Sequence, residues 1–278
     1  MKNNSLTKIV VYLLFSFPLV SCKKEWLDAK PDQSLVVPST LKDLQSSLDN
    51  TLIFNVAGPN LGELGCDDYY LTSTTFQTRS DIDRNTYSWA SGDVYGTSKL
   101  DSWENPYKQI YYANNTLEGI SKIEKDEFNE PAWNNIKGSA LFYRAWAFYN
   151  LSQIFCKPYS TTTASTDLGI ILRTESDINI PSTRSTVQET YNSVIEALKH
   201  AKDLLPINPL YITRPSKKSA FALLARTYLL MENYDSALVY ADACLQFANT
   251  TNQLINFDNV DITPVNPFLY SSNSEIIF

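Results

Sequence analysis

Six stretches of this chain place apolar residues at the three- and four-residue steps of an amphipathic helix, and this repeated spacing constrains the fold most. They cover residues 40–52, 101–120, 131–155, 186–205, 216–231 and 234–248. In the second stretch, for example, Trp103, Tyr107, Ile110 and Leu117 fall on one face. The spacing therefore predicts a mainly α-helical fold.

Local signals mark where several of these helices begin and end. Asp101 with Glu104, and Thr186 with Glu189, have the spacing of a capping box at a helix start. Pro131 stands at a position where a first helical turn tolerates proline, and Pro158 and Pro206 follow predicted helix ends.

The last two helices are joined by the short turn Glu232–Asn233 and have the packing residues of a tetratricopeptide-like helix pair. Small residues at Ala145, Ala225 and Ala237 would let helix axes approach closely. Because the period is far from regular, we predict helix pairs with long loop insertions rather than an even array. The longest insertion, residues 53–99, is expected to be irregular, with one or two short strands.

The first residues have the pattern of an export signal. A basic start is followed by the apolar run 9–20, which is shorter than the roughly 20 residues that cross a bilayer. The sequence Leu19-Val20-Ser21-Cys22 resembles a bacterial lipobox, whose cysteine is acylated and becomes the first mature residue. We therefore expect residues 1–21 to be a lipoprotein signal peptide, Cys22 to carry the lipid, and residues 22–38 to be a tether.

Composition excludes several classes of function. The formal net charge of −7 argues against nucleic acid as a partner, because phosphate binding depends on Lys and Arg. After Cys22, the cysteines Cys66, Cys156 and Cys244 form no metal-binding spacing and are expected to be small buried residues, so no metal or cofactor is predicted. The single histidine, His200, falls on a solvated helix face, and no motif surrounds a nucleophilic serine.

Five segments, in order, resemble the SusD/RagB family of outer-membrane lipoproteins. They are CKKEWLDAKPD, WENPYKQIYYANNTLEGI, IKGSALFYRAWAFYNLSQIFCKPY, RSTVQETYNSVIEALKHAKDLLP and RPSKKSAFALLARTYLLMENYDSALVYA. The resemblance spans nearly the whole chain. It identifies residues 39–278 as a SusD-like N-terminal helical domain, and because family members are usually much longer, we expect the C-terminal SusD/RagB portion to be missing here.

The resemblance implies a function as well as a fold. It implies a non-enzymatic lipoprotein of the cell outer membrane, lipid-anchored and surface-exposed, that binds glycans or, in some members, peptides. It also implies delivery of the ligand to a SusC-like TonB-dependent transporter. Two alternatives stay open: a tetratricopeptide-like scaffold for protein interactions, and an extracellular glycan hydrolase, which the missing catalytic signature disfavours.

The insertion offers residues suited to binding sugars, since Tyr and Trp supply flat apolar faces and Asp and Arg bind hydroxyl groups. The candidates are Asp67, Asp68, Tyr69, Tyr70, Arg79 and Trp89. The alternative is that the aromatic residues only pack the loop and that the acids are turn residues.

Asn114 and Arg144 are polar residues on the apolar stripes of two helices. Since a buried polar group needs partners, we expect them to form a structural bond between helices; the alternative is that they contact a ligand.

Overall fold

The structure, a computed structural model, describes residues 38–96, 99–248, 255–261, 263, 273 and 275–278. The expected signal peptide, the proposed lipidation site Cys22 and all of the tether except Pro38 lie outside these residues.

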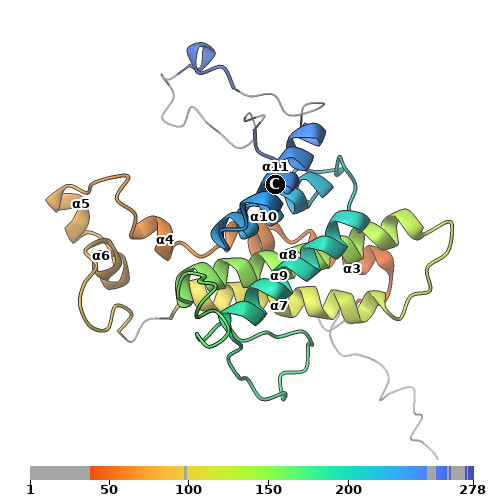
Figure 1. The fold of residues 1–278 in the computed structure, drawn as a ribbon, viewed down its shortest axis with the longest axis horizontal. Helices are drawn as coiled ribbons and strands as arrows, with labels where there is room; N and C mark the ends of the chain where they lie inside the picture. The colour runs from red at the N-terminus through yellow and green to blue at the C-terminus, as the bar shows by residue number, and fades with distance from the viewer. Residues whose placement is uncertain (1–37, 97–98, 249–254, 262, 264–272, 274) are drawn as a thin grey trace, which may run out of the picture. The chain divides into compact units, whose positions relative to one another are not determined.

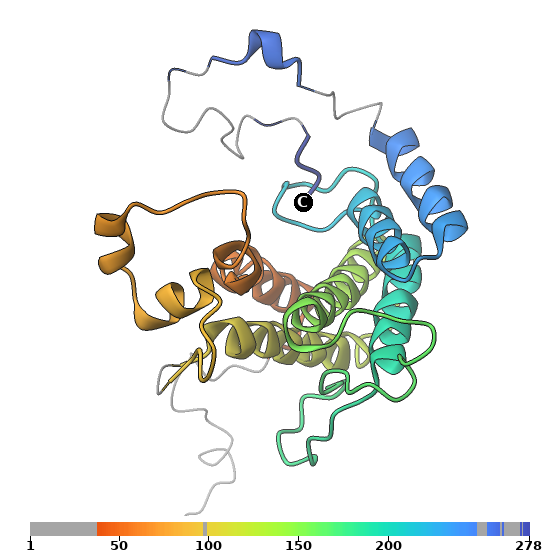
Figure 2. The same cartoon turned by 60° about the vertical axis from the view of Figure 1, so that its left-hand side comes forward.

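The described chain is mainly helical, as the apolar spacing predicts. The long helices are α7 (Asp101–Ile120), α8 (Glu130–Phe155), α9 (Val187–Leu204), α10 (Lys217–Leu230) and α11 (Tyr234–Ala248). Along the chain, each of these long helices packs against the next one in this series (Figures 1 and 2). The short helix α3 (Leu41–Leu48) lies against α7 and α8. This succession of neighbouring helices confirms the expectation of tetratricopeptide-like pairs.

The core is centred on α8, which has helices on several sides. Ala140, Ala145, Phe148 and Leu151 of α8 have no exposed surface. Because α8 is covered by α3, α7 and α9, it is apolar around most of its circumference and does not have a single stripe. Of the small residues expected to bring helices together, Ala145 and Ala237 are buried, whereas Ala225 is only half-buried.

Capping decides where the helices begin. The expected capping box of α9 is present: Glu189 N donates to Thr186 Oγ1 at 3.1 Å and Thr186 N donates to Glu189 Oε2 at 2.8 Å. The bonds from Thr186 hold the pKa of the Glu189 carboxyl below its ordinary value. The capping box expected for α7 is wrong. That helix is preceded by Leu100, which makes no side-chain cap, so Asp101 is already helical.

The insertion contains short helices where short strands were expected, and that expectation is wrong for the described residues. It holds the π-helix η2 (Leu52–Val56) and the helices α4 (Leu61–Leu64), α5 (Ser73–Gln77) and α6 (Asp81–Tyr87). Thr72 caps α5 and Ser80 caps α6, each by accepting a bond from a backbone N–H of the first turn. In the part of the chain that the structure describes there is no strand, only an isolated bridge between Leu168 and Thr186.

Two further features of the described residues bear on function. None of their helices combines the length and the apolar character that a bilayer crossing needs. Cys244 is buried as expected, whereas Cys66 and Cys156 are half-buried, and all three are free thiols.

Candidate functional site

Several hollows on the described surface are large enough to receive a ligand group, and two of them have aromatic linings that bear on function. The first, called here the Trp89 hollow, has a volume of about 410 Å³ and is lined by residues of α4, α6 and the end of α8, including Leu61, Asn85, Thr86, Trp89, Gln153 and Ile154. The second, called the α7 hollow, has a volume of about 300 Å³ and lies between α7 and the segment 168–186. One of the six sugar-binding candidates, Trp89, lines the first.

Trp89 is held in an unusual, exposed position. Its φ is +50°, a backbone conformation that costs energy for a bulky residue, and its side chain is 81% exposed. The indole Nε1 donates a hydrogen bond to the Gly65 carbonyl at 3.0 Å, which fixes the ring relative to α4. The aromatic face is exposed to solvent although the backbone conformation of Trp89 costs energy. This arrangement is expected of a surface that binds a ligand.

Hydrogen-bonding groups surround this ring. Asn85 Nδ2 donates to the Val94 carbonyl at 3.3 Å, and Gln153 Nε2 donates to Ser152 Oγ at 3.0 Å and to Tyr191 Oη at 3.2 Å. The amide oxygens of both residues accept no bond from the described residues, and the buried Thr86 hydroxyl likewise has no partner there. The hollow therefore combines a flat apolar face with free acceptors.

The other five candidates do not line the Trp89 hollow. Tyr69 packs within the insertion: its ring centroid is 5.7 Å from that of Tyr87, and its hydroxyl donates to the Leu64 carbonyl at 2.9 Å. Loss of contact with water raises the pKa of Tyr69. Asp67, Asp68, Tyr70 and Arg79 are exposed, and Tyr70 is 83% exposed.

Sequence reasoning missed Asn85, Thr86 and Gln153. Gln153 is 64 positions from Trp89 and belongs to α8, so no local pattern connects the two residues. Its only signal is that a polar amide stands two residues before the end of a long apolar helix.

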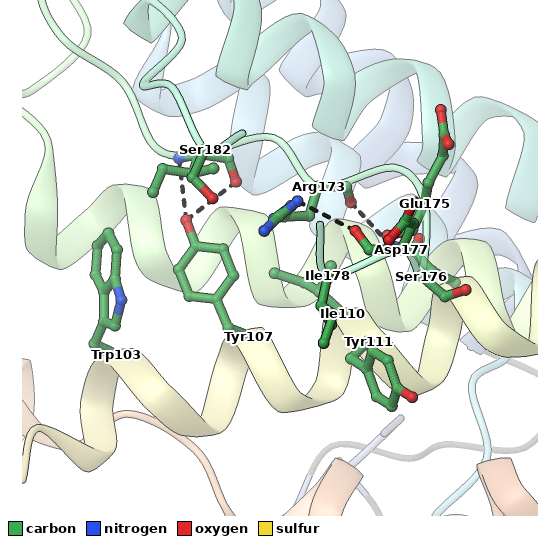
Figure 3. Close-up of a pocket in the computed structure, with 12 residues that line it drawn as sticks. Trp103, Tyr107, Ile110, Tyr111, Arg173, Glu175, Ser176, Asp177, Ile178 and Ser182 are labelled. Atoms are coloured by element: carbon green, nitrogen blue, oxygen red, sulfur yellow. Dashed lines mark hydrogen bonds between the residues drawn. The ribbon is translucent and has the colours of Figure 1, made fainter. Parts of the chain in front are cut away.

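The α7 hollow has an aromatic floor. Trp103, Tyr107 and Tyr111 follow one another at steps of four along α7 and so share a face. Figure 3 shows these three rings in a row, with Ile178 beside Ile110 between Tyr107 and Tyr111. The Trp103 ring also packs edge-on against Phe155 of α8, with centroids 4.9 Å apart.

Polar bonds hold the segment 168–186 over this floor. Tyr107 Oη donates to the Ile171 carbonyl at 3.1 Å and accepts from Ile171 N at 3.0 Å, and burial raises the pKa of Tyr107 to about 12. Glu118 accepts bonds from Ser176 N and Oγ at 2.7 and 2.6 Å. The segment is thereby fixed at both ends of the hollow.

Asn114 links this segment to the core. Its Nδ2 donates to the carbonyls of Arg173 and Glu175 at 3.0 and 3.1 Å, and its Oδ1 accepts from Arg144 Nη1 of α8 at 3.0 Å. Burial lowers the pKa of the Arg144 guanidinium, and its Nε has no partner among the described residues. The two polar residues singled out in the sequence thus bond to each other and join α7, α8 and the segment.

We expect Asn114→Ala to lower the free energy of unfolding by about 2 kcal/mol, because it removes the donor of two loop carbonyls and one of the acceptors of the half-buried Arg144. Urea denaturation followed by circular dichroism measures this change. The neighbouring Asn115→Ala is the control, since the Asn115 amide bonds only to a carbonyl of its own helix. Equal stabilities of the two variants would contradict the structural role of Asn114.

The described part of the chain has few residues that are placed for catalysis or metal binding. No group of three or more His, Cys, Asp or Glu side chains there is placed to hold a metal ion. His200 is exposed, and Asp81 pairs with Arg84 of the same short helix.

Comparison with known proteins gives a consistent result. A SusD-like family model, described as "Starch-binding associating with outer membrane", matches residues 25–229. A curated relative, SusD-like protein P2 of Formosa agariphila, is 29% identical over 136 residues, which are 49% of this chain and 25% of that protein.

Solved structures share the fold. A putative sugar binding protein from Bacteroides vulgatus has a TM-score of 0.67 at 24% identity, covering 78% of this chain and 48% of its own. A SusD superfamily protein from Bacteroides thetaiotaomicron has a TM-score of 0.66 at 24% identity, covering 79% and 49%. A laminarin binding SusD-like protein has a TM-score of 0.57 at 19% identity, covering 76% and 44%. The chain thus spans about half the length of these solved structures and a quarter of the curated relative.

Proposed function

Because the chain belongs to the SusD-like family, we propose that it is a non-enzymatic carbohydrate-binding protein that holds its ligand at the Trp89 hollow. The family description supports a carbohydrate ligand, and so do the names of the solved relatives, one of which is a laminarin binding protein.

One observation carries the choice of site: the Trp89 indole is 81% exposed although its backbone is strained and its Nε1 is bonded. A pyranose ring has one face of C–H groups, which stacks on a flat indole and loses contact with water there. Its hydroxyl groups would donate to the free amide oxygens of Asn85 and Gln153 beside the ring. The exposed Tyr70, Asp67, Asp68 and Arg79 of the insertion would extend contact to a longer chain.

The wider role that we propose follows the family. The protein would be attached to the cell outer membrane through a lipid on Cys22, face outward, and pass oligosaccharide to a SusC-like TonB-dependent transporter. The family description, which includes association with the outer membrane, supports this location. A polar domain held by two or more acyl chains stays at a membrane without crossing it.

We expect Trp89→Ala to weaken binding of soluble starch or laminarin about 10- to 30-fold, since losing a central stacking residue costs about 1.4–2 kcal/mol. Affinity electrophoresis in gels containing each polysaccharide, followed by isothermal titration, measures this effect. Tyr234→Ala is the control, because Tyr234 is an exposed aromatic residue on α11 that does not line the Trp89 hollow.

Two results would count against the proposal. Unchanged affinity of Trp89→Ala for a polysaccharide that the wild type binds would remove the Trp89 hollow as the site. Release of new reducing ends from the bound polysaccharide would show turnover and favour the hydrolase alternative.

A further inference from the structure

We propose that the α7 hollow is a docking site for a protein partner and that it takes one apolar side chain whose neighbours in the partner are basic. This inference does not depend on carbohydrate binding at Trp89. It rests on three observations: aromatic rings form the floor, apolar side chains are exposed at its rim, and the surrounding charge is acidic.

Two polar side chains at the floor of the hollow, Tyr107 and Asn114, are already paired. The Tyr107 hydroxyl both donates to and accepts from the backbone of Ile171, and the Asn114 amide is bonded at both its nitrogen and its oxygen. The rings of Trp103 and Tyr111 and the side chain of Ile110 add apolar surface, and Glu175, Asp177 and Ser182 also line the hollow. An aliphatic or aromatic side chain of a partner would bury this apolar surface away from water and bring no polar group that needs a hydrogen bond.

The rim exposes apolar surface that nothing in the described chain covers. Ile178 is 77% exposed and Tyr111 is 45% exposed, although bonds from α7 fix the segment that carries Ile178. Figure 3 shows Ile178 beside Ile110 at the centre of the hollow. Exposed apolar surface beside a preformed hollow is typical of protein interfaces, where a partner inserts a large anchor residue. A volume of about 300 Å³ suits a single anchor.

The charge around the hollow indicates which residues the partner has on either side of its anchor residue. Two carboxylates, Glu175 and Asp177, line the hollow with one guanidinium, that of Arg173. Beside the hollow, Glu118 bonds to Ser176 and Arg144 bonds to Asn114. Arg173 Nη1 donates to the carbonyl of Ile180 at 2.7 Å. The surroundings are therefore acidic, and a partner with Lys or Arg on either side of the anchor complements them.

The test uses three five-residue peptides with the full chain. One has tryptophan between two glycines and a lysine at each end, the second replaces tryptophan by alanine, and the third replaces the lysines by glutamates. Chemical shifts of ¹⁵N-labelled protein report binding. With the first peptide we expect saturable chemical-shift changes of the Trp103 indole and of the Ile110 and Tyr111 amides, with a sub-millimolar Kd. We expect at least fivefold weaker binding of the acidic peptide and no saturation with the alanine peptide.

A pair of variants separates docking from carbohydrate binding. Ile178→Asp is expected to weaken binding of the tryptophan peptide at least tenfold and to leave the affinity for starch and laminarin unchanged. Leu210→Asp is the control, because Leu210 is 74% exposed and lies outside the hollow. Both side chains are exposed, so both variants should fold, which circular dichroism checks.

Several results would overturn the docking proposal. They are the absence of saturation with the tryptophan peptide, equal binding of the acidic peptide, and an equal effect of Leu210→Asp. Displacement of the peptide by laminarin oligosaccharides would make the hollow a sugar site instead. A dimer in sedimentation that Ile178→Asp dissociates would make a second copy of the chain the occupant.

Discussion

Gly169→Ala should lower the free energy of unfolding by about 3 kcal/mol, because the added methyl group has no space. A Cβ at this position would stand 2.3 Å from the Thr186 carbonyl oxygen and 2.4 Å from Thr190 Oγ1. The nearest obstacle is backbone at the start of α9, and a backbone cannot rotate away as a long side chain can. Gly169 also donates to the Ser185 carbonyl at 2.7 Å, a bond that the displaced segment would lose.

The change is measured by urea unfolding, which gives a free energy if the transition is two-state. Gly62→Ala is the matched control: its Cβ would meet nothing within 4 Å, and Gly62 lies in helix α4. Since alanine is a better helix former than glycine, this control should be neutral or more stable by up to about 1 kcal/mol. If the two alanine variants were equally stable, the close approach at Gly169 would be refuted.

Phe148→Ala should have the largest effect on stability, a loss of about 3–5 kcal/mol. Phe148 lies in the middle of α8 with none of its surface exposed, and its neighbours in the core come from several helices. Removal of the ring takes away buried apolar surface and leaves a cavity that close-packed helices only partly fill.

Thermal and urea unfolding both measure this loss, and Phe128→Ala controls for the chemistry of the substitution. Phe128 is 88% exposed in the connection between α7 and α8, so its removal should change the free energy of unfolding by less than about 0.5 kcal/mol. A cost at Phe148 as small as that at Phe128 would mean that α8 is not the centre of the core.

Short-range patterns were sufficient for the long helices but not for the insertion. The stripe from Trp103 to Ile120 lies on α7, and Thr186 with Glu189 caps α9 as predicted, because each signal involves residues within one or two turns. In the insertion, Ser, Thr and Asp favour turns and helix caps equally, so the sequence suggested strands where Thr72 and Ser80 cap one- and two-turn helices. Asp101 failed as a cap because α7 begins one residue earlier than its pattern implies.

The candidate sites, too, could be predicted only in part from the sequence. The sequence identified Trp89 as an aromatic residue in a loop rich in polar groups, and it identified Asn114 and Arg144 as polar residues on apolar stripes. It could not show that the indole is fixed by the Gly65 carbonyl or that Gln153 of α8 comes beside it. Nor could it show that Tyr69, chosen with Trp89, is held by Tyr87 and Leu64 within the insertion.

By itself, the amino-acid sequence determined the helical character, the order of the helices, their paired arrangement and the family. These properties depend on periodic apolar spacing and local capping, which act between residues a few positions apart. Only the tertiary structure decided which side chains share a hollow, because those contacts join α4 and α6 to α8, and α7 to the segment 168–186. Such contacts depend on how the helices pack against one another, and patterns among residues that are close in the sequence do not predict that packing.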